Sequence, residues 1–535
     1  PKGLLSFMTA MPVWIKEKVF QKKIIHDELK AIQPYDKGKL KLLFPEHHLS
    51  HAASAFFPSP FEEAAIVTLD GVGEWATASI CKGEGNSIRV LKELHFPHSI
   101  GLLYSAFTYF LGFRVNSGEY KLMGLAPYGI GDSAQVREYI QSIQKELIEI
   151  MEDGSIWINQ EYFRYATGLS MVNEKKWSSL FGFARSDPES PIHQEHANLA
   201  LAIQRVTEEV LLKIALEAKR ITGSEHLCLA GGVALNCVAN GKLMKEGIFR
   251  ELFIQPAAGD AGGSIGAALS AYHIYYQMER SPGPEDAMHG ALLGPDFSDR
   301  EIELVAKKFG AVVDHFREEE DLTEKVASLL AEGKVVGWFQ GRMEFGPRAL
   351  GNRSILGDAR NRDMQKKLNL KIKYRESFRP FAPAVLAEDA KDYFDLPCNS
   401  PYMLLTAPVR ETHRKEIPEN YDQLPLMDRL YVDRSVIPAV THIDFSARIQ
   451  TVHRESNPRF HRLLGAMKQK TGTSVVVNTS FNVRGEPIVC SPLDAYRCFM
   501  RTEMDYLVMG NYLFEKSRQP GWPEEDRGKR EVALD

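Results

Sequence analysis

The chain has 535 residues, of which 44% are hydrophobic and 25% are charged, and its formal net charge is -5. This composition is typical of a soluble globular protein with several domains, and the mild acidity gives no general attraction to nucleic acid or to acidic membranes. The six cysteines form no C-x-x-C pair, which argues against a disulfide framework and favours the reducing cytoplasm. No apolar run approaches the roughly 20 residues of a membrane-spanning helix, so we expect no membrane insertion.

Strands and helices alternate along the first half of the chain. An apolar stretch over 3–15, followed by lysines, predicts a helix lying on the fold, with a helix on a membrane surface as the alternative. Hydrophobic periodicity then predicts strands and helices in turn, with strands over 64–69, 75–81 and 226–230 and helices over 101–113, 134–151, 196–221 and 262–276. The repeated order of strand, glycine turn and helix is typical of an α/β fold.

A turn-rich polar stretch over 278–299 predicts a domain boundary. We therefore expect a first domain over 1–285, a second over 286–519 and a polar tail over 520–535. The pattern restarts after the boundary, with helices predicted over 301–309 and 322–332 and buried strands over 335–339 and 474–477.

The sharpest local signal is the string HHLSH, which contains His47 and His51. On a helix these two side chains project from one face because they are four residues apart, and this spacing suits two nitrogen ligands of one metal. Asp70 ends a predicted strand and Asp260 lies in the turn GDAGG. Two histidines with a carboxylate suit Fe(II), and Zn(II) is compatible. The alternative is that the histidines cap a helix and bond to the backbone.

Three glycine-rich turns stand beside predicted strand–helix junctions: DGVG from Asp70, GGVALN from Gly231 and GDAGG from Gly259. Glycine lets the backbone approach a phosphate, and helix N-termini present free N–H donors to it. Neither G-x-x-x-x-G-K-[ST] nor a G-x-G-x-x-G after a strand occurs, which excludes a P-loop protein and a simple Rossmann dehydrogenase. One such turn is usually only a tight loop, whereas three favour a nucleotide site.

Basic residues recur in apolar loops. Glu119 and Lys121, in SGEYKLMGLAP, either belong to the nucleotide site or form a surface ion pair. In the second half, basic residues lie among glycines, prolines and aromatics, and polar residues end a buried strand. Arginine binds phosphate oxygens bidentately, so a small phosphate-bearing ligand explains this set better than structural ion pairs do. The residues concerned are Arg348, Lys373, Arg379, Arg448, Asn478 and Ser480.

Taken together, these motifs resemble the carbamoyltransferases of the nodulation and antibiotic-tailoring family. The strings occur in order over almost the whole chain, so the set is specific although each string alone is weak. They are PEHHLSHAASAFFPSPF, VTLDGVGEWATASI, GEYKLMGLAPYG, LAGGVALNCVAN, QPAAGDAGGSIGAAL, GRMEFGPRALGNRSIL, IKYRESFRPFAPAV and VNTSFNVRGEPIV.

The resemblance implies an actin-like (ASKHA) first domain, similar to the tRNA-threonylcarbamoyl transferase, followed by an α/β YrdC-like domain. The second domain would form carbamoyl-adenylate from carbamoyl phosphate and ATP. The first domain would pass the carbamoyl group to a hydroxyl of a small acceptor. Family members begin with a strand and turn that form a phosphate loop, whereas this chain opens at Pro1, so we expect the N-terminal strands of the first domain to be missing. A homodimer is compatible with the sequence.

The resemblance also implies roles for individual residues. Iron, or alternatively zinc, would be held by His47, His51, Asp70 and Asp260. ATP, with Mg, would be contacted by Gly231, Gly232, Asn236, Lys121 and Arg348. Carbamoyl phosphate would be bound by Lys373, Arg379, Arg448, Asn478 and Ser480, with Lys373, Arg379 and Arg348 taking part in catalysis.

Two other functions remain open at this point. A metal-dependent hydrolase would use His47, His51 and Asp70, but it would leave the arginine-containing loops unexplained. A non-catalytic nucleotide-binding partner would leave the two-histidine site unexplained.

Overall fold

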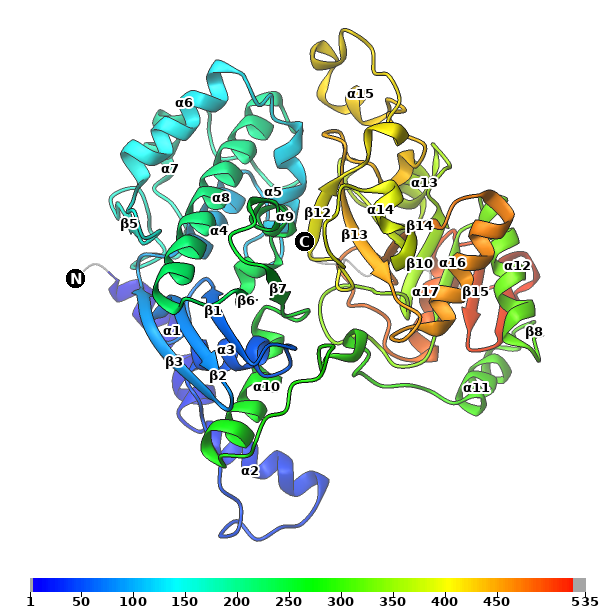
Figure 1. Cartoon of the computed structure of the whole chain (residues 1–535), viewed down its shortest axis with the longest axis horizontal. Coiled ribbons are helices and arrows are strands. Elements are labelled where there is room, and N and C mark those ends of the chain that lie inside the picture. The colour runs from blue at the N-terminus through cyan, green and yellow to red at the C-terminus, as the bar shows by residue number, and fades with distance from the viewer. Residues whose placement is uncertain (1–2, 523–535) are drawn as a thin grey trace.

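The computed structural model describes residues 3–522 and arranges them as two α/β units side by side (Figure 1). Each unit is built on a sheet that contains both parallel and antiparallel strand pairs. The predicted α/β class is therefore confirmed. Most of the predicted polar tail, from residue 523 on, lies outside the described residues.

The first sheet has five strands in the order β3-β2-β1-β6-β7. Three consecutive strands form an antiparallel meander, and two later strands add in parallel on the other side. The central strand is buried from Ala64 to Leu69, which agrees with its continuous apolar run AAIVTL. The bounds are β1 (Glu63–Leu69), β2 (Ala76–Glu84), β3 (Ser87–His95), β6 (His226–Ala230) and β7 (Glu251–Ile254).

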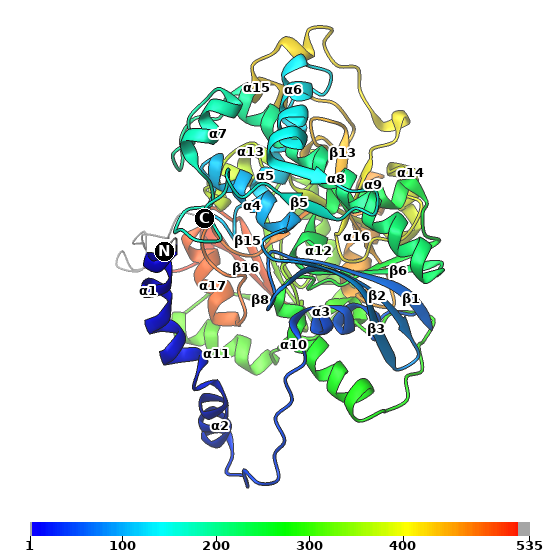
Figure 2. The same ribbon diagram turned by 90° about the vertical axis from the view of Figure 1, so that its left-hand side faces the viewer.

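Helices cover both faces of the first sheet (Figure 2). On one side α10, made of small residues, packs against α3 so closely that a Cβ on Gly266 would lie 1.8 Å from the carbonyl oxygen of Ser50. On the other side the long α8 runs past α4. The bounds are α1 (Leu4–Val13), α2 (Gln21–Ile32), α3 (His47–Phe56), α4 (Ile100–Phe110), α5 (Glu119–Leu125), α6 (Ala134–Ser142), α7 (Glu174–Phe181), α8 (Gln194–Thr222), α9 (Cys237–Glu246) and α10 (Asp260–Leu269).

The helix predicted over 134–151 was wrong in its second half. Helix α6 ends at Ser142, and a π turn follows over 143–147. The chain then forms β4 (Ile148–Ile150), which pairs with β5 (Ile156–Ile158). Ile148 and its partner Ile158 are both buried, so a small hairpin covers these side chains where a continued helix was expected.

The stretch over 3–15 forms the predicted helix, α1, although most of its described apolar side chains are exposed. Phe7 and Met8 are 60% and 63% exposed. Helices α1 and α2 lie at the periphery of the molecule in Figure 2. Within the described residues, no helix is both long enough and apolar enough to cross a bilayer.

The second sheet has nine strands in the order β12-β13-β11-β14-β10-β9-β15-β16-β8. Strand β14 lies centrally, antiparallel to both β10 and β11. The bounds are β8 (Asp314–His315), β9 (Val336–Phe339), β10 (Arg353–Asp358), β11 (Ala382–Leu386), β12 (Leu405–Pro408), β13 (Ser446–Val452), β14 (Val475–Ser480), β15 (Tyr506–Met509) and β16 (Tyr512–Glu515).

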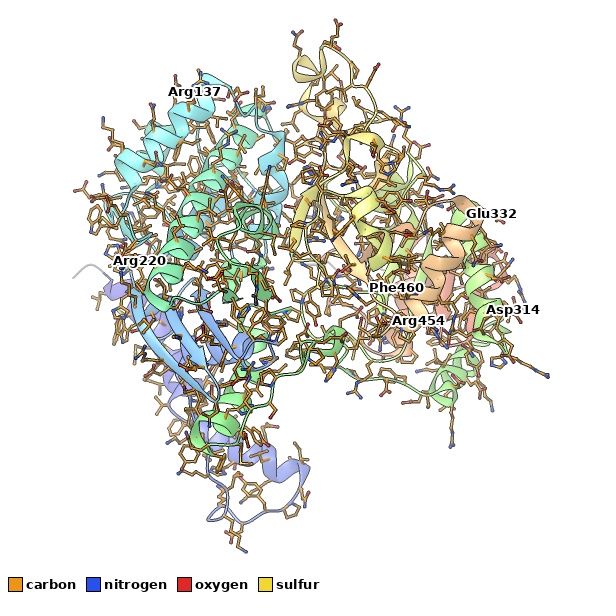
Figure 3. The ribbon with its side chains drawn as sticks, viewed as in Figure 1. Arg137, Arg220, Asp314, Glu332, Arg454 and Phe460 are labelled. Carbon is orange, nitrogen blue, oxygen red and sulfur yellow. The ribbon has the colours of Figure 1, made fainter. Side chains whose placement is uncertain are left out.

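Helices of the second unit complete its core. Phe460 on α16 is fully buried, whereas Asp314 and Glu332 lie at the outer edge of the unit (Figure 3). The bounds are α11 (Asp299–Phe309), α12 (Glu319–Ala331), α13 (Met364–Leu368), α14 (Ala390–Tyr393), α15 (Leu426–Leu430), α16 (Pro458–Thr471) and α17 (Pro492–Arg501).

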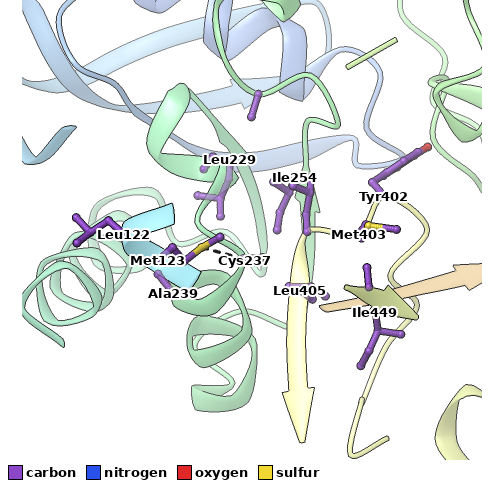
Figure 4. Packing of buried hydrophobic residues seen from close by; sticks show 14 of the residues in the cluster. Leu122, Met123, Leu229, Cys237, Ala239, Ile254, Tyr402, Met403, Leu405 and Ile449 are labelled. Carbon is purple, nitrogen blue, oxygen red and sulfur yellow. Dashed lines mark hydrogen bonds between the residues drawn. The ribbon is translucent and has the colours of Figure 1, made fainter. Parts of the chain in front are cut away.

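The two units meet where β12, the edge strand of the second sheet, packs against α9. A Cβ on Gly241 would lie 2.2 Å from the carbonyl oxygen of Thr406, and Nδ2 of Asn240 donates to the carbonyl oxygen of Leu404 at 3.1 Å. Buried apolar side chains continue this contact, with Leu229 and Ile254 on the first unit and Leu405 and Ile449 on the second (Figure 4). Backbone-close packing of this kind holds the facing walls of the two units in a defined relation.

Candidate functional site

Four predicted metal ligands converge beside the first sheet. His47 and His51 lie one turn apart on α3, and Asp70 directly follows β1. The Nε2 atoms of the two histidines are 3.0 Å apart and lie 3.0 and 3.1 Å from Oδ2 of Asp70. One ligand atom from each of these residues and from Asp260 fall within 4.8 Å of one another. The alternative that the histidines cap a helix through backbone bonds is therefore wrong.

Asp70 is the charged centre of this His/Asp cluster. Its Oδ1 accepts hydrogen bonds from the N–H groups of Gly71 at 2.8 Å and Gly232 at 3.2 Å. Burial alone would raise the pKa of Asp70, but the hydrogen bonds from His47 and His51 outweigh burial and hold that pKa well below its usual range. The carboxylate is consequently ionised at neutral pH, with Oδ2 facing both imidazoles.

Asp260 closes the cluster from the solvent side. It is the first residue of α10, where the helix dipole favours a carboxylate, and its side chain is 81% exposed. Its Oδ1 lies 3.7 and 3.6 Å from Nε2 of His47 and His51. Of the four candidate ligands, Asp260 is thus the one most accessible to solvent.

The chemistry and spacing of these donors fit a transition metal. Ligand atoms about 2.1 Å from an ion and at right angles to one another lie about 3.0 Å apart, which matches the triangle formed by His47, His51 and Asp70. Neighbouring His48 is directed elsewhere, since its Nδ1 is 2.6 Å from Oγ1 of Thr68. Burial and the adjacent histidines lower the pKa of His48 to about 4, so this ring is neutral. Two imidazoles and two carboxylates suit iron or zinc.

Lys373 marks a second cluster, in the second unit. It ends a π turn over 369–373, and its ammonium group is buried against the end of β14. Nζ donates to the backbone oxygen and the hydroxyl of Ser480 and to both oxygens of Asn482, the last at 3.0 and 2.8 Å. Burial and the nearby charge of Arg375 lower the pKa of Lys373 well below its usual range. Lys373 and Ser480, predicted to share a site, are in direct contact.

Three buried arginines lie close to this cluster, and we call the set that they form with Lys373 and Arg379 the cationic cleft. Burial lowers the pKa of Arg348, Arg375 and Arg448, and the charges of Arg448 and Arg379 contribute. In the part of the chain that the structure describes, the buried Nε atoms of Arg348 and Arg448 have no hydrogen-bond partner. Clustered, desolvated cations of this kind are relieved by an anionic ligand.

Asn478 lies beneath the loop that carries Arg348. Its Nδ2 donates to the carbonyl oxygen of Ala349 at 3.1 Å and to Oε1 of Gln450 at 2.7 Å. Because side chains alternate along a strand, Asn478 and Ser480 share one face of β14. The structure therefore brings these two predicted residues to one face of the strand, Asn478 beside the Arg348 loop and Ser480 beside Lys373.

Lys121 joins this cleft from the first unit. It is 1% exposed, and its Nζ lies 3.1 Å from Oε1 of Glu376, whereas Glu119 accepts a hydrogen bond from the hydroxyl of Ser105. The alternative of a surface ion pair between Glu119 and Lys121 is therefore wrong. Arg379 also binds Glu376, through Nη1 at 3.3 Å.

The glycine turn after β6 lies between the two clusters. Gly231 passes so close to β1 that a Cβ there would lie 2.2 Å from the carbonyl oxygen of Leu69, and Gly232 bonds to Asp70. Asn236 caps α9 by accepting from the N–H of Ala239 at 3.1 Å, and its amide also pairs with Gln204. The side chain of Asn236 is thus occupied within the protein.

Two contacts join the segments that carry Arg348 and Arg448 to the first unit. A Cβ on Gly346, two residues before Arg348, would lie 2.9 Å from the carbonyl oxygen of Pro256, in the loop that leads to Asp260. On the other side, Thr406 is the strand partner of Arg448 and donates to the carbonyl oxygen of Cys237 at 3.3 Å. Both clusters therefore border the interface between the units.

Three charged residues of the cleft were missed at the level of sequence. Arg375 and Glu376 stand in the same string, KYRESFR, as Lys373 and Arg379, which was the available signal. Arg484 follows β14 and lies 3.4 Å from Glu376. Nothing in the local pattern FNVRGEP around Arg484 indicated that contact, because it depends on the tertiary structure.

Comparison with known families and proteins gives a consistent result. A family model described as the carbamoyltransferase N-terminus matches residues 1–269, and one described as the carbamoyltransferase C-terminus matches residues 327–516. An uncharacterised protein of Synechocystis sp. is 56% identical over 100% of this chain and 86% of its own length.

More distant relatives carry functional names. The nodulation protein NolNO of Sinorhizobium fredii is 38% identical over 89% of this chain and 64% of its own length. A 3'-hydroxymethylcephem-O-carbamoyltransferase of Streptomyces clavuligerus is 31% identical over 61% of this chain and 55% of its own length. The chain thus spans somewhat under two thirds of each of these two longer relatives.

Proposed function

Because the chain belongs to the carbamoyltransferase family, we propose that it is an ATP-dependent O-carbamoyltransferase. It takes the carbamoyl group from carbamoyl phosphate and transfers it, through carbamoyl-adenylate, to a hydroxyl of a small molecule in the cytoplasm. The observation that carries the proposal is the contact of the Gly346 loop, which leads to Arg348, with the Pro256 loop, which leads to Asp260. A labile mixed anhydride that is made at one cluster and used at the other favours neighbouring sites, and this contact joins the two loops.

The first half-reaction belongs to the cationic cleft of an YrdC-like second domain over 286–519. Carbamoyl phosphate and water give carbamate and phosphate, and a carbamate oxygen then attacks the α-phosphorus of ATP, so that pyrophosphate leaves. Lys373, Arg379 and Arg448, with Asn478 and Ser480, hold the carbamoyl phosphate. Arg348 stabilises the negative charge that develops on the phosphate groups.

The second half-reaction belongs to the actin-like first domain over 1–285. The acceptor hydroxyl attacks the carbamoyl carbon, its proton passes to a base, and AMP leaves. The backbone at Gly231 and Gly232 and the cap at Asn236 border the nucleotide, and Lys121 reaches it from α5. Excluding water between the units protects the intermediate from hydrolysis.

His47, His51, Asp70 and Asp260 hold the metal, for which we propose Fe(II). When bound, the metal supplies a Lewis acid that polarises the intermediate. Asp70 remains ionised because both imidazoles bond to it, and the exposed Asp260 lies at the open side of the cluster. A metal-dependent hydrolase on the same ligands has no support among the relatives and leaves the cationic cleft without a role.

A product assay tests the proposal. Purified protein is incubated with ATP, carbamoyl phosphate and a panel of hydroxyl compounds, and pyrophosphate, phosphate, AMP and acceptor mass are followed. We expect pyrophosphate release that requires carbamoyl phosphate, and an acceptor whose mass increases by one carbamoyl group. Cleavage of carbamoyl phosphate without consumption of ATP would contradict the proposal.

A further inference from the structure

One carboxylate, that of Glu376, contacts three cations from three separate segments. Its oxygens lie 3.1 Å from Nζ of Lys121 on α5, 3.3 Å from Nη1 of Arg379 and 3.4 Å from Nη2 of Arg484. Lys121 belongs to the first unit and the two arginines to the second. Glu376 therefore stands where the two walls of the cleft meet.

The surroundings fix the orientation of these cations. The guanidinium of Arg379 lies 4.6 Å from the ring centre of Tyr120, the neighbour of Lys121 on α5. Arg484 also pairs with Glu189 on a loop of the first unit. A cavity of about 80 Å³ opens beside the contact and is lined in part by Lys121 and Glu376.

The ionisation of Glu376 follows from these neighbours. Burial by itself would raise its pKa, but the charges of Lys121 and Arg379 outweigh burial and lower the pKa to about 2. Glu376 is therefore an anion at neutral pH. The contact between Glu376 and Arg379 uses Nη1 of the arginine. Because a guanidinium carries five N–H donors, other N–H groups of Arg379 remain for the oxygens of a ligand.

We propose that Glu376 is a positioning residue that holds Arg379 and Lys121 across the cleft and competes with the phosphate group of the substrate for these cations. This inference rests on the proposed function, in which Arg379 binds carbamoyl phosphate. The carboxylate keeps the guanidinium and the ammonium aligned before substrate arrives, and its negative charge opposes an incoming phosphate. Removing the charge should therefore strengthen anion binding and weaken turnover at the same time.

Titration with inorganic phosphate tests the inference without requiring the reaction. We expect Glu376→Gln to bind phosphate about three- to tenfold more tightly than the unmodified chain, because one opposing charge is lost. We expect kcat for pyrophosphate release to fall at least about tenfold, because Arg379 is no longer oriented. Phosphate affinity that is unchanged or weaker in Glu376→Gln overturns the inference.

Two further variants separate charge from position. Asp314→Asn removes a carboxylate that pairs with Arg518 at the outer edge of the second unit (Figure 3), and we expect its phosphate affinity to stay near that of the unmodified chain. Glu376→Asp keeps the charge but shortens the side chain, so we expect phosphate affinity near the original value and a low kcat. If Glu376→Asp also binds phosphate more tightly, loss of the charge is not the cause and the inference fails. Absence of pyrophosphate release by the unmodified chain would instead contradict the proposed function, while the phosphate titrations still decide the role of Glu376.

Discussion

The His/Asp cluster and the cationic cleft differ in how their charge is balanced. In the first, two imidazoles face an ionised Asp70, so the donors already bond to one another. In the second, several buried cations surround Glu376, and the Nε atoms of Arg348 and Arg448 have no partner among the described residues. The donors of the first cluster are thus already paired with one another, whereas the second keeps buried donors without a partner among the described residues.

The two clusters also differ in how the chain builds them. His47 and Asp70 are 23 residues apart, and a single helix and the end of one strand bring them together. Lys121 and Glu376 are 255 residues apart and meet only because two units pack against each other. Damage to the first cluster should therefore remain local, while damage to the second should affect substrate binding and the contact between the units together.

The largest expected effect is on the cationic cleft. We expect Arg379→Ala to lower pyrophosphate release by about a hundredfold or more, because a preorganised donor to the phosphate is lost. Lys373→Ala should lose as much activity and also some stability, since Ser480 and Asn482 lose their shared donor. Arg137→Ala, at the outer surface (Figure 3), is the control. Pyrophosphate release by Arg379→Ala at the control rate would exclude this role.

The next effect separates the two half-reactions. We expect His51→Ala to lose its metal and carbamoyl transfer while still releasing pyrophosphate, because the cationic cleft is untouched. His48→Ala is the matched control, since that ring bonds to Thr68 and should leave the metal in place. Metal content by mass spectrometry and acceptor mass are the measurements. A full complement of iron in His51→Ala would show that this imidazole is not a ligand.

A smaller effect concerns the packing of α10 on α3. We expect Gly266→Ala to lower stability by about 1–3 kcal/mol, because the new methyl group meets the backbone at Ser50 and the helices must separate. Gly263→Ala, on the same helix but with no atom within 4 Å of its Cβ, should gain about 0.5–1 kcal/mol. Urea unfolding of both variants measures the difference. Equal stability would show that α10 can shift freely.

The last effect, which is absent at neutral pH, is a dependence of stability on pH. Glu376 has a pKa lowered from 4.5 to about 2 in the folded chain, so the unfolded chain binds more protons in that window. The contribution of Glu376 to the free energy of unfolding is therefore complete above pH 4.5, and it is lost as the pH falls toward 2. Glu376→Gln removes this titrating group. We therefore expect the slope of the unfolding free energy against pH to be smaller in this variant by up to about 1.4 kcal/mol per pH unit, which corresponds to one proton. Unfolding curves measured between about pH 5 and about pH 3 provide the test, and parallel curves for the two proteins would contradict it.

The sequence predicted local features better than tertiary contacts. The i,i+4 spacing of His47 and His51 and the apolar run before Asp70 were enough to predict that these side chains gather in one cluster that could hold a metal, because a helix and a strand end present them directly. The pairing of Lys121 with Glu376 was not predicted, since it depends on how the units dock. Periodicity also failed at Ile148, where pairing with β5 overrides helix propensity.

The contact between α9 and β12 has a consequence for association with other chains. Strand β12 is the terminal strand of the nine-stranded sheet, and unpaired strand edges recruit other chains. Here Asn240 bonds to the backbone beside this strand, and Gly241 allows the helix to lie almost against Thr406. The first unit therefore covers this edge of the second sheet. We expect the second unit, produced alone, to expose strand β12 and to associate edge to edge with other copies.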